Sequence, residues 1–173
     1  MQVLLNAAID AFIAFRTQEG AALQAMFTEK LDGIAELLAQ VEPFEKGRVA
    51  KIKERLEQSL AQLSAETQAQ VDRNRLEQEM IYYLEKLDIT EEKVRLTNHI
   101  KYFRETMVES LDTQPLHAGS GSGVGKKLGF IAQEMGREIN TLGSKSNQSE
   151  MQIIVVKMKD ILEQIKEQVL NVL

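Results

Sequence analysis

The sequence contains no cysteine, no tryptophan and only two prolines among its 173 residues, and aromatic residues make up just 5% of it. The lack of cysteine excludes a disulfide scaffold, thiolate catalysis and cysteine-ligated zinc. It also fits a reducing cytoplasm, where we expect this protein to reside. The scarcity of proline and the abundance of Leu, Ala, Glu, Gln and Lys favour helix.

Long apolar runs are also missing. None reaches the roughly 18–20 residues that a membrane-spanning helix needs, and the N-terminus lacks the features of a signal peptide. We therefore expect no membrane association. The chain enters an apolar helical pattern at Met1-Gln-Val-Leu with no capping residue before it, which predicts missing upstream sequence. The net charge of −5 argues on average against nucleic-acid binding, but it conceals local basic clusters.

Apolar residues recur at helical spacing along most of the chain, and no stretch alternates with period two for long enough to form a strand. The fold class is predicted to be all-α, with about five to six long helices in an extended hairpin or bundle. The expected helices cover residues 2–41, 44–66, 68–87, 91–111, 126–140 and 148–171. The apolar stripes expected on the second, fourth and fifth of them are Val49, Ile52, Leu56, Leu60 and Leu63; Leu96, Ile100, Phe103, Met107 and Leu111; and Leu128, Ile131, Met135, Ile139 and Leu142. Thr90 is the expected N-cap of the fourth helix. The Gly/Ser-rich residues 112–125 are expected to form a flexible loop.

Glu92, Arg95 and His99 share one face of the fourth expected helix, because they are three and seven residues apart. A carboxylate, a guanidinium and an imidazole in line could hold a metal ion or a phosphate. A solvated face with an ordinary ion pair explains the same pattern. Four cations fall in an acid-free stretch that predicts a phosphate-contacting patch: Lys93, Arg95, Lys101 and Arg104.

The segment 126–150 contains the densest set of polar groups. Glu134 and Glu138 lie one helical turn apart and could bind a divalent cation or supply a general base. A salt-bridged surface is about as probable from chemistry alone. Small hydrogen-bonding residues and a lysine then interrupt the pattern before the last helix, which is typical of an anion site. The potential phosphate-binding residues here are Arg137, Asn140, Ser144 and Lys145.

Several stretches resemble the C-terminal part of the YicC-like endoribonuclease family. The most specific is GKKLGFIAQEMGREINTLGSKSNQSE, followed by a helix ending IKEQVLNVL. RLEQEMIYYLEKLDITEEKVRLTNHIKYFRETM and RTQEGAALQAMFTEKLDGI are similar to the family's preceding helices. The resemblance covers nearly the whole chain, but the family's N-terminal α/β domain is absent from it. It implies a helical tail of the N-terminal region over 1–42, a central helical hairpin over 43–88 and the C-terminal helical domain over 89–173.

The resemblance further implies a bacterial, metal-dependent endoribonuclease that cleaves single-stranded RNA and assembles into ring-like homo-oligomers. A divalent cation, Mn or Mg, is the expected cofactor, and RNA is the expected partner. The predicted metal ligands are Glu92, His99, Glu134 and Glu138, of which His99, Glu134 and Glu138 are also the predicted catalytic residues. Arg95, Arg137, Asn140, Ser144 and Lys145 are predicted to hold RNA phosphates. The alternative is a non-catalytic RNA-binding or oligomerisation module.

Overall fold

A computed structural model describes residues 2–67, 73–112, 121–146 and 148–172, and these residues are helical nearly throughout, with no strand among them. The all-α prediction is confirmed. Six helices have 15 residues or more and α2 has five. The helices are α1 (Gln2–Ala39), α2 (Glu42–Lys46), α3 (Arg48–Thr67), α4 (Arg73–Leu87), α5 (Thr90–Asp112), α6 (Gly121–Lys145) and α7 (Ser149–Val169).

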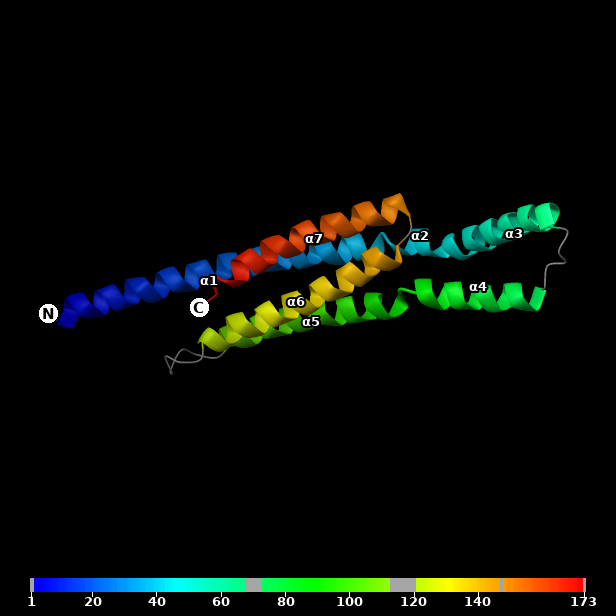
Figure 1. Cartoon of the computed structure of the whole chain (residues 1–173). Coiled ribbons are helices and arrows are strands. Elements are labelled where there is room, and N and C mark those ends of the chain that lie inside the picture. The colour runs from blue at the N-terminus through cyan, green and yellow to red at the C-terminus, as the bar shows by residue number, and fades with distance from the viewer. Residues whose placement is uncertain (1, 68–72, 113–120, 147, 173) are drawn as a thin grey trace.

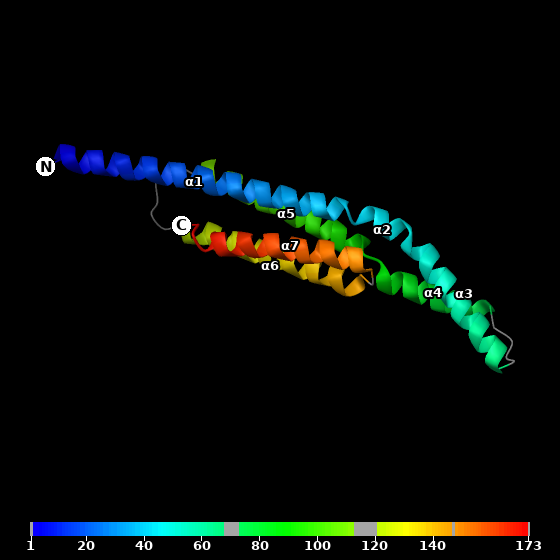
Figure 2. The same ribbon diagram turned by 90° about the horizontal axis from the view of Figure 1, so that it is seen from above.

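The molecule is an elongated four-helix bundle with a projection at each end (Figure 1). α5 packs on α6, α6 on α7, α7 on α1 and α1 on α5, so the four helices close a ring around one core. At one end α3 and α4 extend past the bundle as a helical arm, and at the other the N-terminal half of α1 projects alone (Figure 2). None of the described helices is long and apolar enough to cross a membrane.

The core forms where the apolar stripes of the four bundle helices meet. On α6 the predicted stripe is buried in full, as Leu128, Ile131, Met135, Ile139 and Leu142. α1 and α5 meet through Phe27 and Phe103, whose rings lie edge to face with centroids 5.5 Å apart. Burying such side chains supplies about 1.5–3 kcal/mol each, so the stripes hold the bundle together.

The arm departs from the sequence prediction. The helix expected at 44–66 is divided at Gly47 into α2 and α3, and Pro43 lies in the first turn of α2, where its missing N–H costs nothing. The apolar stripe predicted to be buried on α3 is only half-buried at Ile52, Leu56 and Leu60. Val49 and Leu63 of that stripe lie outside the described side chains. None of the described side chains of α3 and α4 is fully buried.

Two helix boundaries also differ from expectation. α6 begins at Gly121, so residues 121–125 of the predicted loop are helical, while residues 113–120 lie outside the described ones. α6 also continues to Lys145, so the break expected at 141–147 begins only after that residue. The hydroxyls of Thr141 and Ser144 donate to carbonyls one turn back, those of Arg137 and Thr141, so their polarity is satisfied inside the helix.

Candidate nucleic-acid interface

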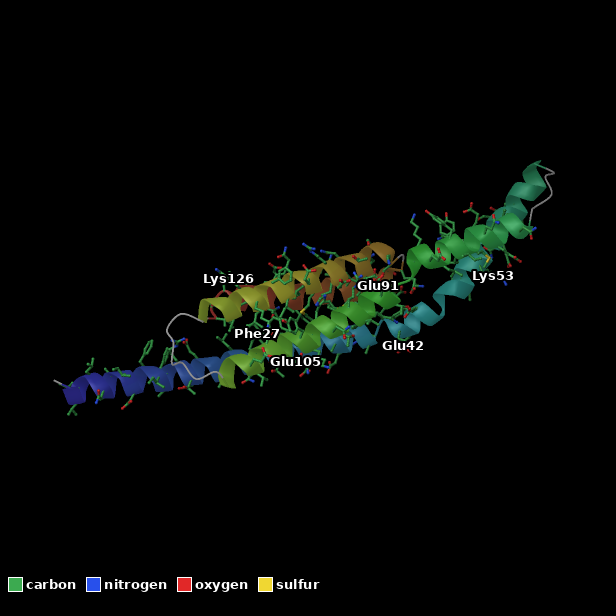
Figure 3. The ribbon with its side chains drawn as sticks, turned by 90° about the horizontal axis from the view of Figure 1, so that it is seen from below. Phe27, Glu42, Lys53, Glu91, Glu105 and Lys126 are labelled. Atoms are coloured by element: carbon green, nitrogen blue, oxygen red, sulfur yellow. The ribbon has the colours of Figure 1, made fainter. Side chains whose placement is uncertain are left out.

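The two polar faces predicted on separate helices meet where α5 packs on α6. We call this contact, formed by Glu92, Arg95, Glu138 and Lys145, the α5–α6 seam. α5 and α6 run antiparallel, and two of the ion pairs between them lie in the seam: Lys145 Nζ lies 2.8 Å from Glu92 Oε1, and Arg95 Nη1 lies 3.9 Å from Glu138 Oε1. A third pair, Lys127 with Glu109 at 3.5 Å, joins the two helices nearer their other ends. Figure 3 labels Glu91 at the start of α5, beside the arm, and Lys126 at the opposite end of the bundle. The seam therefore lies on the half of the bundle next to the arm.

Glu92 is the most unusual side chain of the seam. It is only 7% exposed although it is charged, and its Oε2 is buried with no hydrogen-bond partner. Lys145 donates to its other oxygen and also, at 2.8 Å, to the backbone carbonyl of Asp88. A buried carboxylate oxygen without a donor is costly, so Glu92 requires a specific structural or functional explanation.

The turn that precedes Glu92 is fixed by Asp88. Its Oδ1 accepts hydrogen bonds from the Thr90 backbone N–H at 2.9 Å and from the Thr90 hydroxyl at 2.7 Å. The capping side chain at the start of α5 is therefore Asp88, and the prediction of Thr90 as the cap is wrong. The Thr90 hydroxyl, then its N–H, and more weakly the nearby Lys145 lower the pKa of Asp88 below its usual range.

The three predicted catalytic residues divide between seam and surface. Glu138 is 8% exposed and faces α5, whereas Glu134 is half-buried and pairs with Arg137 of its own helix at 3.4 Å. His99 is half-buried two turns along α5 from Glu92. Among the described residues, neither His99 nor Glu134 forms an ion pair between the two helices.

The predicted phosphate ligands form a row on the solvent side of α6. Arg137, Asn140 and Ser144 are exposed and recur at three- and four-residue steps, so they follow one face. Lys145 is the part-buried member that joins this row to the seam. The row therefore presents polar side chains on the solvent side of α6, where they are accessible to phosphate oxygens.

Comparison with known proteins matches residues 41–173 to the family model described as "Endoribonuclease YicC-like, C-terminal". The chain is 32% identical to a protein of Clostridioides difficile named probable endoribonuclease YicC, over 98% of this chain and 55% of that relative. It is also 32% identical to a protein of Haemophilus influenzae with the same name, over 92% of this chain and 50% of that relative. The chain belongs to the YicC-like endoribonuclease family. It spans about half the length of these relatives.

All the seam residues lie inside the part that matches the YicC-like family model. The basic patch predicted on α5, however, is not a set of free cations. Each of the four has a carboxylate within ion-pair distance: Lys93 with Glu45, Arg95 with Glu91, Lys101 with Glu105, and Arg104 with Asp32. These partners come from elsewhere in the sequence or from one turn away. An acid-free sequence stretch therefore did not produce an acid-free surface.

The predicted metal ligands are not gathered tightly. Within the part of the chain that the structure describes, no three Asp, Glu or His side chains come close enough together to hold a metal ion. Glu92 and Glu138 face Lys145 and Arg95, whose positive charges disfavour a second cation at those oxygens. The described residues thus do not fit a divalent cation held by one chain, and metal dependence stays a prediction.

Sequence reasoning missed Gln152, a residue of α7. Its Nε2 donates to the backbone carbonyls of Gly143 and Ser146, at 2.6 Å each, and so satisfies the end of α6 next to Lys145. α6 and α7 approach closely here, since a Cβ on Gly143 would lie 3.0 Å from Val155 Cγ1. Only the pairing of the two helices shows this role, because Gln152 lies on an otherwise ordinary polar face.

Proposed function

We propose that this chain binds single-stranded RNA along α6 and takes part in cleavage of its phosphodiester bonds at the α5–α6 seam. The observation that carries the proposal is the Glu92–Lys145 pair within the family-matched region: a buried carboxylate with one unpartnered oxygen, held 2.8 Å from an ammonium. Membership of an endoribonuclease family supports RNA as the substrate class.

The chemistry assigned to these residues is positional and electrostatic. Glu92 positions the Lys145 ammonium through their 2.8 Å contact, since its second oxygen is buried and lies out of reach of an RNA hydroxyl. Lys145 and Arg95 lie where positive charge can stabilise a phosphate that gains charge in the transition state. The exposed donors Arg137 and Asn140 hold the neighbouring phosphates in register. No step is assigned to Mn or Mg, although both belong in the test.

The test is cleavage of a 5′-labelled single-stranded RNA with manganese, magnesium or chelator present. We expect Glu92→Gln and Lys145→Met to lower the cleavage rate at least tenfold, and His99→Gln and Glu138→Gln to lower it less. Lys101→Met is the matched control, because Lys101 pairs with Glu105 on the exposed surface of α5. Full cleavage by both Glu92→Gln and Lys145→Met would overturn the assignment.

A second function, self-assembly, rests on a different observation. Residues 3–19 of α1 are all exposed, and they include Leu4, Phe12 and Phe15 at 78%, 61% and 58% exposure. Asp10 is the only charged residue between positions 3 and 15, so the segment is apolar on every side. A helix of that kind is normally buried, which supports the homo-oligomer expected from the family. Sedimentation of Phe12→Glu against the unchanged chain tests it: a loss of mass supports assembly, and an unchanged mass opposes it.

A further inference from the structure

The arm carries an aromatic surface that neither the seam nor the core uses. Tyr82 and Tyr83 of α4 are 57% and 40% exposed, and they follow Ile81, which is also 57% exposed. The two rings lie with centroids 6.0 Å apart, and Lys86 Nζ lies 5.9 Å from the Tyr82 ring. Consecutive exposed aromatic side chains next to a cation are not explained by packing, because the other face of α4 supplies its half-buried residues.

The position of these side chains relates them to the seam. α4 ends at Leu87, one residue before Asp88, whose carbonyl accepts from Lys145. At 1.5 Å per residue, Tyr83 lies about one helical turn and a half from that junction. The surface is thus the next feature along the molecule after the proposed cleavage site, on the side where α4 enters the arm (Figure 1).

α3, the other helix of the arm, carries positive charge near the same end of the bundle. The segment 46–57 has five cationic residues and two acidic ones. Of these, Lys51, Lys53 and Arg55 are exposed on α3. The pKa of Glu150, at the start of α7, is lowered first by its own backbone N–H and by the Ser149 hydroxyl, and also by Lys51. α2 and α3 leave the bundle at the end where α7 begins, which is the end where the seam is found (Figure 1).

Single-stranded RNA matches this combination of groups. Its unstacked bases offer flat faces to aromatic rings, and its phosphates alternate with those bases at short intervals. We propose that Tyr82, Tyr83 and Lys86 form a base-stacking platform, which holds nucleotides that flank the bond cut at the seam. This inference rests on the proposed RNA substrate and adds a binding subsite to it.

The chain offers a direct optical test, because it has no tryptophan and only three tyrosines, two of which form the platform. Tyrosine emission should fall when an unlabelled single-stranded RNA oligonucleotide binds. Tyr102→Phe should keep most of that quenching, since Tyr102 lies on α5 beneath Lys127. The double variant Tyr82→Phe/Tyr83→Phe should lose the quenching but keep the affinity, because phenylalanine still stacks.

Affinity measured by anisotropy of a labelled oligonucleotide completes the test. Tyr82→Ala/Tyr83→Ala should weaken binding about tenfold or more without changing its salt dependence. Lys86→Gln should instead reduce the slope of log affinity against log salt by about one. The matched control Ile81→Ala removes an equally exposed apolar side chain and should bind normally.

Three outcomes would overturn the platform. One is unchanged affinity in the double alanine variant, and another is equal loss in Ile81→Ala. The third is a double alanine variant that sediments with a different mass but binds RNA normally. That result would make the surface a contact between copies of the chain. Absence of RNA binding by the unchanged chain would instead overturn the proposed function itself, so the two failures are distinguishable.

Discussion

α3 and α6 are built to similar patterns but end in different surroundings. Both carry apolar residues at helical spacing, over 20 and 25 residues. On α6 the stripe is buried because α5 and α7 pack against it, whereas on α3 Ile52, Leu56 and Leu60 remain half-buried in the arm. An amphipathic pattern thus specifies that a face can be buried but not that a partner exists within the chain. The arm still exposes apolar and aromatic side chains, whereas the bundle buries most of its apolar side chains in the core.

The sharpest contrast between bundle and arm should appear in leucine truncations. Leu31→Ala in the bundle should lower the free energy of unfolding by about 2–5 kcal/mol, because Leu31 is 0% exposed and its removal leaves a cavity. Leu60→Ala in the arm should cost less than about 1 kcal/mol, since that side chain is only half-buried. Urea unfolding followed by circular dichroism measures both. Equal costs would mean that the arm is covered in solution.

Within the bundle, removing the lysine of the seam should lower the free energy of unfolding. Lys145→Ala leaves the buried Glu92 carboxylate without its partner and should cost about 1–3 kcal/mol. Adding Glu92→Gln should recover part of this loss, because the unpaired charge is removed. Thermal unfolding of the single and double variants gives the coupling free energy between Lys145 and Glu92. A single variant as stable as the unchanged chain would show that the pair contributes nothing.

The junction between arm and bundle should show a smaller, pH-dependent effect. Asp88→Ala removes the acceptor for the Thr90 N–H and should cost about 1 kcal/mol near neutral pH. Because folding lowers the pKa of Asp88 from its ordinary 3.8, its contribution is present above that pH and is lost as the pH falls through the folded-state value. The stabilities of the two chains should therefore converge in acid. A difference that persists at pH 2 would contradict the assignment.

The smallest effect is expected on the exposed surface of α5. Lys101 Nζ lies 3.8 Å from Glu105 Oε1, and both side chains are more than half exposed. Lys101→Ala should change stability by no more than about 0.5 kcal/mol, and less in high salt. The comparison with Lys145→Ala separates the effect of burial from that of charge. If Lys101→Ala proved as costly as Lys145→Ala, burial would not be what distinguishes the seam.

Much of the bundle could be predicted from the sequence, because helical periodicity is a local signal. Periodicity predicts the core stripe of α6 in full and that of α5 at Leu96, Ile100, Phe103 and Met107, while Leu111 lies outside the described side chains. It also locates the dense polar groups after Gly125. The break predicted at 141–147 begins later than expected, after Lys145, because Thr141 and Ser144 satisfy their hydroxyls within the helix. The prediction of a basic patch of unpaired cations on α5 was wrong for a different reason. The partners of Lys93 and Arg104 are Glu45 and Asp32, which are distant in sequence.

The sequence by itself determined the helices, their apolar faces and the family, since these depend on residue type and spacing along the chain. Only the tertiary structure decided which polar faces meet. It joined Glu92 to Lys145, 53 positions apart, left Glu92 Oε2 without a donor, and left Tyr82 and Tyr83 exposed on the arm. The physical reason is that burial and pairing depend on which helices pack together, and antiparallel packing brings together residues that spacing along one helix cannot relate.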